Sequence, residues 1–190
     1  MCICKFSLSS YRLYLQIPRA VIEPLLFASL VFSVAGLHGG FTGWLGFSFV
    51  CILCANYANA YGSFLSASFD RMETAALFSV PFELIGTMFS GIYLNLASAT
   101  KYVSWIRYFS GFYYGVESIS ILQWDSIESI KCVNVPGMPC IKTGPEVLAR
   151  FGYKDENFWR NCTALATMYF VAHFIAFTMV LKRSRGTPVY

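Results

Sequence analysis

Two cysteines in the most polar stretch of the chain have the spacing of a small disulfide loop. Cys132 and Cys140 enclose Pro136-Gly137, a turn signal that can bring the two sulfur atoms together in an oxidising compartment. A zinc site is the alternative, but it needs four ligands, and no second Cys or His pair lies nearby. We therefore predict a disulfide between Cys132 and Cys140.

A carboxyl group lies alone in a long apolar stretch. Residues 74–100 contain a single charged side chain, Glu83. Burying a carboxylate in hydrocarbon is costly, so such a group persists only beside a partner or an aqueous cavity. Two interpretations stay open: Glu83 faces a cavity near a translocation path, or it pairs with a neighbouring helix.

Other reactive side chains lack the spacing that catalysis needs. A P-loop requires glycine directly before its lysine, and none of the six lysines follows a glycine. The two histidines, His38 and His173, have no suitable nucleophile nearby, and an intramembrane histidine usually bonds a neighbouring helix. Cys51 and Cys54 have C-x-x-C spacing but lie in an apolar run, which favours packing. We predict no catalytic, cofactor-binding or metal-binding residue in this chain.

The composition is that of a membrane protein. Hydrophobic residues make up 56% of the 190 residues and charged residues 13%, whereas soluble domains carry about 25% charged residues. Residues 24–69 and residues 161–181 contain no Asp, Glu, Lys or Arg. Each run is long enough to cross a bilayer, which takes about 20 apolar residues. The fold class that we predict is an all-α membrane protein.

The longest uncharged run must hold two helices, and the glycine-rich residues 36–43 divide it. A short polar turn, residues 70–73, precedes the next apolar stretch. We therefore predict four transmembrane helices, at residues 19–37, 41–69, 74–94 and 161–181.

Positive charges orient these spans, since Lys and Arg near span ends favour the cytoplasm. They flank the first and last spans as Lys5, Arg12, Arg19, Lys182, Arg183 and Arg185. We predict that residues 1–18 and 182–190 are cytoplasmic and that residues 125–160 form an external loop. This topology explains the net charge of +4, so no nucleic-acid partner is predicted.

An aromatic segment precedes the external loop. Residues 101–124 contain eight aromatic side chains. Four of them follow the spacing of one helical face: Trp105, Tyr108, Phe109 and Phe112. The segment is either an aromatic belt at the interface or two short helices that dip into the outer leaflet and separate near Ser110-Gly111. We predict that residues 98–124 are re-entrant or interfacial helices.

Several motifs resemble, in order, the C-terminal half of the membrane domain of G-type ABC half-transporters, most closely the insect White, Scarlet and Brown group. They are Ile22-Glu-Pro-Leu25, Met88-Phe-Ser-Gly-Ile-Tyr-Leu-Asn95, Ser110-Gly-Phe-Tyr-Tyr-Gly-Val-Glu117, Gln123-Trp124, Pro139-Cys-Ile-Lys-Thr-Gly-Pro-Glu-Val-Leu148 and Asn157-Phe-Trp159. Brown-like members have Pro-Phe-Asp-Leu where this chain has Pro81-Phe82-Glu83-Leu84, which favours a Scarlet-like or Brown-like chain.

The resemblance implies a partial ABC-2 type transmembrane domain. The four predicted spans would be the family's third to sixth, residues 98–124 its re-entrant pair, and Cys132 and Cys140 its external disulfide. The family's ATPase domain, which binds ATP and Mg²⁺, is missing here, so this chain alone should not transport. An arginine common in the family is Tyr113 here, so any role of that charge is absent.

The resemblance also implies a function: ATP-driven movement of small aromatic or lipophilic molecules, such as tryptophan metabolites or guanine derivatives that serve as eye-pigment precursors. The implied partners are a second half-transporter, membrane lipid and the substrate, in a pigment-granule or plasma membrane. The implied substrate cavity is lined at helical spacing by Phe78, Phe82, Glu83 and Phe89. Coupling to the ATPase is assigned to Asp70, Arg71 and Glu73.

Two other kinds of protein have some of these features. A four-span scaffold of tetraspanin type also has a large second external loop, but that loop should hold a Cys-Cys-Gly motif and at least four cysteines, and this one has two. The other alternative is a truncated product that pairs with full-length partners and regulates them, or a fragment of a longer gene product.

Overall fold

The computed structural model describes residues 2–93, 104–130 and 141–186, with side chains described between residues 18 and 183. The described residues form helices joined by turns and contain no strand. The elements are α1 (Cys2–Ala35), α2 (Gly40–Ser68), α3 (Met72–Met88), η1 (Ser104–Phe109), α4 (Gly111–Trp124), α5 (Gly144–Phe151), η2 (Asp155–Asn157) and α6 (Phe158–Gly186).

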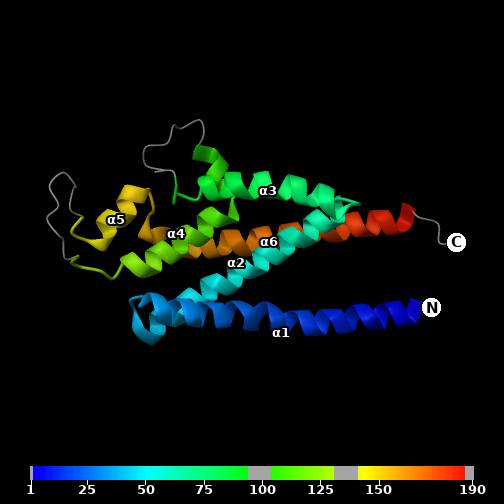
Figure 1. The fold of residues 1–190 in the computed structure, drawn as a ribbon, viewed down its shortest axis with the longest axis horizontal. Coiled ribbons are helices and arrows are strands. Elements are labelled where there is room, and N and C mark those ends of the chain that lie inside the picture. Colours follow the sequence, from blue (N-terminus) through cyan, green and yellow to red (C-terminus); the bar gives the residue numbers. More distant parts are fainter. Residues whose placement is uncertain (1, 94–103, 131–140, 187–190) are drawn as a thin grey trace.

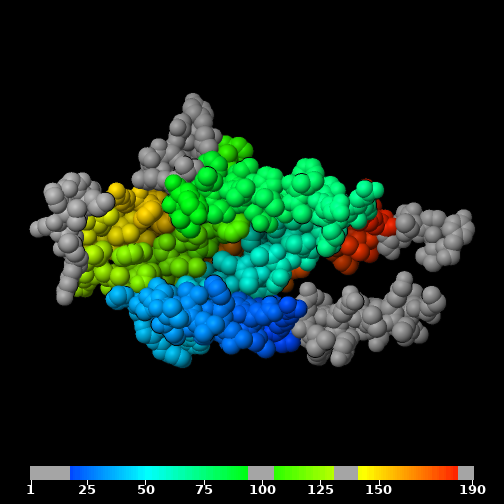
Figure 2. Space-filling view, viewed as in Figure 1, coloured from blue at the N-terminus to red at the C-terminus, as the bar shows by residue number. Residues whose placement is uncertain are grey.

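The long helices run lengthwise through the molecule, and α2 lies at their centre (Figure 1). It contacts α1, α3, α4 and α6. The short helices α4 and α5 gather at one end, while the N-terminal end of α1 and the C-terminal end of α6 lie at the other (Figure 1). In Figure 2, α1 forms one edge of the molecule and α3 the opposite edge.

Among the residues that the structure describes, three helices are long and apolar enough to cross a membrane. The qualifying segments are Pro18–Ala35, Gly40–Ser68 and Asp155–Arg183. Large apolar side chains on these helices are unusually exposed, among them Val34 at 86% and Phe174 at 69%. Such surfaces are stable against lipid rather than water. The chain is an integral membrane protein.

The helix α3 is shorter than the span predicted at residues 74–94. It has 17 residues, which gives a length of about 25 Å at 1.5 Å per residue, against about 30 Å of hydrocarbon in a bilayer. It ends at Met88 because the chain turns at Ser90 and Gly91, where Gly91 has a φ of 102°. A fourth crossing of the membrane therefore stays a prediction.

A glycine turn joins α1 to α2. Gly36 and Gly39 have φ angles of 60° and 110°, which other residues rarely adopt. The turn is tied to α4, because the His38 backbone N–H donates to Gln123 Oε1 at 3.3 Å and the two side chains lie 3.4 Å apart. Residues 1–18 are predicted as a cytoplasmic N-terminal segment, and α1, which begins at Cys2, runs without interruption from there into the first span.

The aromatic segment is two helices on either side of Ser110. A 3₁₀ helix, η1, ends at Phe109, and α4 begins at Gly111. Ser110 has an extended backbone, so the four aromatic side chains with helical spacing do not share one continuous α-helical face. Entry of this pair into a bilayer stays a prediction.

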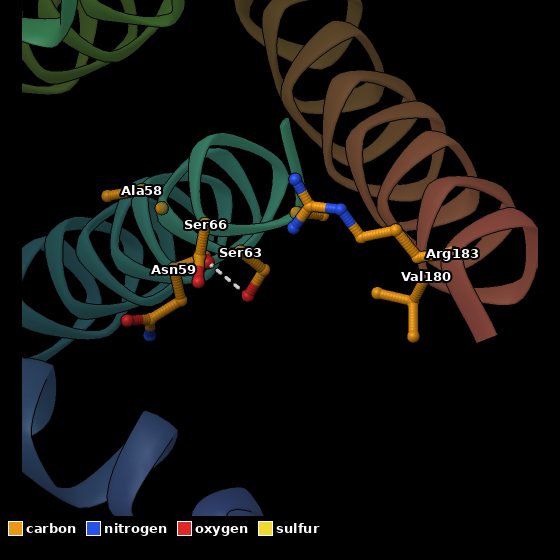
Figure 3. Close-up of a pocket in the computed structure, with 8 residues that line it drawn as sticks. Ala58, Asn59, Ser63, Ser66, Val180 and Arg183 are labelled. Atoms are coloured by element: carbon orange, nitrogen blue, oxygen red, sulfur yellow. Dashed lines mark hydrogen bonds between the residues drawn. The ribbon is translucent and has the colours of Figure 1, made fainter. Parts of the chain in front are cut away.

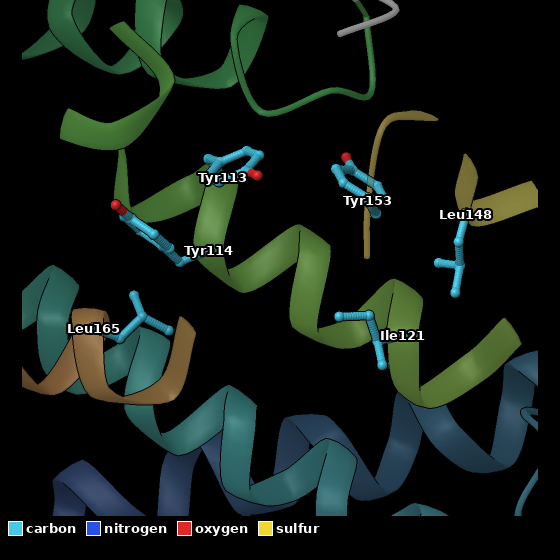
Figure 4. Packing of buried hydrophobic residues seen from close by; sticks show 6 residues of the cluster. All are labelled: Tyr113, Tyr114, Ile121, Leu148, Tyr153 and Leu165. Carbon is cyan, nitrogen blue, oxygen red and sulfur yellow. The ribbon is translucent and has the colours of Figure 1, made fainter. Parts of the chain in front are cut away.

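A core of buried side chains holds the short helices against the long ones (Figure 4). Its members come from α4, α5, α6 and the turn after α5: Tyr113, Tyr114, Ile121, Leu148, Tyr153 and Leu165. The helix α5 approaches α4 closely, because Gly144 lies directly against the Trp124 backbone and its N–H donates to Ile127 O at 2.9 Å. This core fixes the end of the bundle that carries α4.

Candidate functional site

A pocket of about 430 Å³ lies between α2, α3, η1 and α4. Its walls are mostly apolar, and Glu83 is the only charged residue among the described residues that line it. Five aromatic rings contribute to the wall: Tyr57, Tyr61, Phe82, Phe109 and Phe112. The pocket is within the range of about 300–1,000 Å³ typical of small-molecule sites.

Helical periodicity places one face of α2 along this pocket. The lining residues of α2 recur every three or four positions: Cys54, Tyr57, Ala58, Tyr61, Gly62 and Leu65. Glycines on the facing helices leave the space open. The Tyr57 ring lies against Gly111, where an added Cβ would come within 2.2 Å of the ring. Ser110 donates from its hydroxyl to Gly86 O at 3.1 Å, which ties α4 to α3.

Aromatic stacking joins α2 to α3 at two levels. Tyr61 and Phe82 stack with ring centroids 5.7 Å apart, and Phe69 and Phe78 stack at 5.1 Å. The first pair lies in the pocket wall, whereas the second lies closer to the α2–α3 connection, since Phe69 directly follows α2. The two stacks set the rotation of α3 relative to α2.

The structure brings together two of the four residues predicted to line a substrate cavity. Phe82 and Glu83 line the pocket. Phe78 does not line the pocket and stacks on Phe69 instead. Phe89 follows the last residue of α3 and does not line the pocket either. The cavity assignment of all four residues stays a prediction.

The residues predicted to couple to an ATPase lie in the turn between α2 and α3. Arg71 is the N-cap residue of α3 and accepts the Ala75 N–H at its carbonyl oxygen, at 3.2 Å, and Glu73 lies in the first turn. Asp70 forms an ion pair with Arg183 of α6, with 2.5 Å between Oδ1 and Nη2. This exposed ion pair places the turn next to the end of α6.

A groove between α2 and α6 adjoins this ion pair. Figure 3 shows Asn59, Ser63 and Ser66 along α2, with the Arg183 side chain extending from α6 across the groove. The Ser63 hydroxyl donates to the backbone oxygen of Asn59 at 2.9 Å. Polar side chains thus mark the end of the molecule that carries the two termini.

The predicted disulfide lies outside the described residues, since neither Cys132 nor Cys140 is among them. The residues on either side of residues 131–140 are hydrogen-bonded to each other, because the Ile130 N–H donates to Lys142 O at 2.8 Å. In α2 and at the start of α6, Cys51, Cys54 and Cys162 are free thiols. The packing interpretation of the C-x-x-C pair stays a prediction.

A buried carboxyl group in α4 escaped the sequence analysis. Glu117 has no exposed surface. It accepts hydrogen bonds from Asn157 Nδ2 at 3.0 Å, from Asn161 Nδ2 at 2.9 Å and from the Lys154 backbone N–H at 3.3 Å. These bonds join the middle of α4 to the start of α6. The available signal was that Glu117 is the only charged residue in α4.

Asn161-Cys162-Thr163 matches the sequence pattern for N-glycosylation, and its asparagine belongs to the same hydrogen-bond network. The Asn161 amide nitrogen, to which a glycan would attach, is fully buried and donates to Glu117. Asn161 Oδ1 is also buried, and it has no hydrogen-bond partner among the described residues. Asn161 therefore has a structural role in this fold.

A profile of the ABC-2 type transporter family matches residues 6–124, which is more than half of the chain. The chain belongs to the ABC-2 type transporter family. The match contains every residue that lines the pocket.

Relatives of this ABC-2 chain include Protein brown of Drosophila virilis, which is 33% identical over 190 residues, covering 97% of this chain and 28% of the relative. Protein scarlet of Drosophila melanogaster is 29% identical over 171 residues, covering 89% of this chain and 26% of the relative. Protein white of the same fly is 23% identical over 172 residues, covering 90% of this chain and 25% of the relative. The greater similarity to Scarlet and Brown than to White confirms the prediction that the chain is Scarlet-like or Brown-like. The chain spans about a quarter of the length of these relatives.

The stability of the core around Tyr153 should decrease at alkaline pH. Its hydroxyl donates to Ser90 O at 2.8 Å. Burial, together with the nearby charge of Glu117, raises the pKa of Tyr153 to about 12 from its ordinary value of about 10. Below pH 10 the hydroxyl keeps its proton in both states, and its stabilising effect is complete. Between pH 10 and 12 only the unfolded state loses the proton, so stability falls as the pH rises through the folded pKa.

The measurement is the thermal unfolding midpoint of the detergent-solubilised chain at several pH values from 8 to 11.5. Lysines also titrate in this range, so the comparison is with Tyr153→Phe. This variant should be less stable at pH 8, because Ser90 O loses its donor, and should decline less steeply above pH 10. Parallel curves for the two proteins would contradict the assignment.

Proposed function

We propose that this chain is the membrane-spanning part of an ATP-driven half-transporter, which pairs with a second half and moves small aromatic or lipophilic molecules across a membrane. The observation that carries the proposal is the apolar pocket with five aromatic rings inside the region that matches the ABC-2 family. Eye-pigment precursors such as tryptophan metabolites or guanine derivatives are the substrates that we propose, because their flat rings suit such walls.

The energy source lies in a separate part of the transporter. One relative, 26% identical over 175 residues and covering 89% of this chain, is named an ABC transporter ATP-binding protein/permease. We propose that ATP and Mg²⁺ bind to a domain of that kind, and that Asp70, Arg71 and Glu73 receive its motion. The ion pair between Asp70 and Arg183 supports this, because it would carry a displacement of the turn directly to α6.

The proposed topology follows from the distribution of charge. Both termini are cytoplasmic, and residues 125–160 face a lumen or the cell exterior, in a pigment-granule or plasma membrane. On that side we propose the disulfide between Cys132 and Cys140, and the hydrogen bond between Ile130 and Lys142 supports it by closing the chain around them.

The second half would contact the apolar surface of α3. Exposed side chains on this helix include Leu77, Val80 and Leu84. Together they form an apolar face that a neighbouring transmembrane helix could cover. Lipid is the other partner of such surfaces.

A chimera tests this function. The aligned quarter of Protein brown would be replaced by this chain and expressed with a second half-transporter, and ATP-dependent uptake of tritiated tryptophan and guanine would be measured in membrane vesicles. We expect uptake that Phe82→Ala lowers at least about tenfold, the effect of losing about 1.4 kcal/mol of binding. The matched control is Phe174→Ala, which removes an exposed ring of α6 outside the pocket. Uptake that responds equally to both substitutions would overturn the proposed role of the pocket.

A further inference from the structure

We propose that the pocket between α2, α3 and α4 selects ligands that carry a positively charged amine beside an aromatic ring. This inference rests on the proposed transport of aromatic molecules, and it narrows their chemistry to aromatic ammonium cations. Neutral and anionic aromatic compounds would bind more weakly at the same site.

The first observation in favour of a cationic ligand is the negative charge of the pocket. Glu83 is its only charged lining residue, and no Lys, Arg or His side chain is among the described residues of the wall. The ion pairs found in the described part of the chain, Arg19 with Glu23 and Asp70 with Arg183, lie elsewhere. In the described part of the chain, the wall therefore presents one acidic group that a cationic ligand could neutralise, and no basic group that would favour an anion.

The aromatic rings carry the second step. Phe82 precedes Glu83 on α3 and stacks on Tyr61 of α2. Tyr61 and Glu83 both line the pocket. The faces of aromatic rings attract cations, and the attraction grows where water is excluded. A carboxylate beside a pair of stacked rings is thus suited to an ammonium group, whose charge both features stabilise.

The remaining wall carries the third step, because it leaves room for the uncharged part of the ligand. Phe109 and Phe112 lie on the α4 side of the pocket, with aliphatic residues such as Ile106 and Val116. These side chains can pack against a planar ring without competing for its amine. The volume of about 430 Å³ suits an indole or a ring of similar size with a short side chain.

The test uses four compounds that share one indole ring and differ in charge: tryptamine is a cation, tryptophan a zwitterion, 3-methylindole neutral and indole-3-acetate an anion. The complete chain would be purified and placed in nanodiscs of phosphatidylcholine, which carries no net charge and does not concentrate amines. Displacement of tritiated tryptamine would give the affinity of each compound. We expect tryptamine to bind about tenfold more tightly than 3-methylindole, and indole-3-acetate to bind most weakly.

Glu83→Gln is the decisive variant, since it keeps the size of the side chain and removes its charge. It should lower the affinity for tryptamine about tenfold and leave the affinity for 3-methylindole, determined by direct binding of the tritiated compound, unchanged. The matched control is Glu128→Gln, which removes an exposed acidic group outside the pocket and should change neither affinity. Thermal unfolding of each variant shows whether it is folded.

The outcomes separate this inference from the function on which it rests. If tryptamine and 3-methylindole bind equally, and Glu83→Gln alters neither, selection by charge is overturned while an aromatic pocket stands. If none of the four compounds binds to the folded chain, the aromatic pocket itself is overturned, together with the substrate class in the proposed function.

Discussion

Replacing Glu117 with alanine is expected to destabilise the chain by about 3–5 kcal/mol, one of the two largest effects of a single substitution that the structure predicts. The carboxyl group is fully buried and accepts three hydrogen bonds. Without it, the amide groups of Asn157 and Asn161 and the Lys154 N–H are left without an acceptor in a dry region. The start of α6 would then lose its attachment to α4.

Glu117→Gln should cost less, about 1–2 kcal/mol. The new amide could still accept at its oxygen, and its nitrogen could donate to Asn161 Oδ1, which has no partner in the described structure, if the Asn161 amide turned over. That rearrangement moves the unsatisfied group rather than adding another. The two substitutions therefore test whether hydrogen-bond acceptance or mere volume holds α4 against α6.

The free thiols provide the readout. A maleimide dye that fluoresces on reaction reports unfolding, because the buried thiol of Cys162 becomes accessible only when the helices separate. The midpoint of this reaction during heating should fall most for Glu117→Ala, less for Glu117→Gln, and by no more than experimental scatter for Glu128→Gln, whose side chain is exposed. Equal midpoints for Glu117→Ala and Glu128→Gln would show that the Glu117 network does not stabilise the fold.

Gly144→Ala should also be severely destabilising, by about 3 kcal/mol. The added Cβ would lie 1.8 Å from the Trp124 carbonyl oxygen and 3.1 Å from that of Ile127. Both contacts are with backbone, so no side-chain rotation relieves them. The helix α5 would have to move away from α4, which would break the hydrogen bond from Gly144 N–H to Ile127 O and expose Leu148 of the core.

The matched control is Gly62→Ala, in the interior of α2, where an added Cβ meets nothing within 4 Å. Alanine is favoured over glycine inside a helix by about 0.5–1 kcal/mol, so this control should be neutral or stabilising. The same thiol assay should show a lower unfolding midpoint for Gly144→Ala by about 5–10 °C. A midpoint equal to that of the Gly62 variant would contradict the close approach of α5 to α4.

The membrane character and the family could be predicted from the sequence, because both depend on local patterns. Uncharged runs such as residues 24–69 are visible without tertiary structure, and the glycines of residues 36–43 lie where the chain turns between α1 and α2. The motifs that indicated the Scarlet and Brown group are short and contiguous. Such local patterns can be recognised without knowing which residues are in contact in the folded protein.

The site was harder to predict, because burial depends on distant partners. Glu83 is the single charge of residues 74–100 and Glu117 the single charge of α4, yet only Glu83 attracted attention. Glu117 lies in an aromatic segment that resembles an interfacial belt, and its partners Asn157 and Asn161 are 40 and 44 residues downstream. Helical spacing also could not show that α3 ends at Met88, just before Phe89.

The shortness of α3 has a consequence for biogenesis. A segment of 17 residues with a carboxyl group near its middle is a poor substrate for independent insertion by the translocon, since a charged residue at a helix centre costs about 2.5–3.5 kcal/mol. The ribosome delivers α2 first, and the stacked pairs Tyr61–Phe82 and Phe69–Phe78 give α3 a partner as it emerges. If α2 and α3 insert together as a hairpin, the insertion of α3 depends on the earlier synthesis of α2 as well as on the hydropathy of α3.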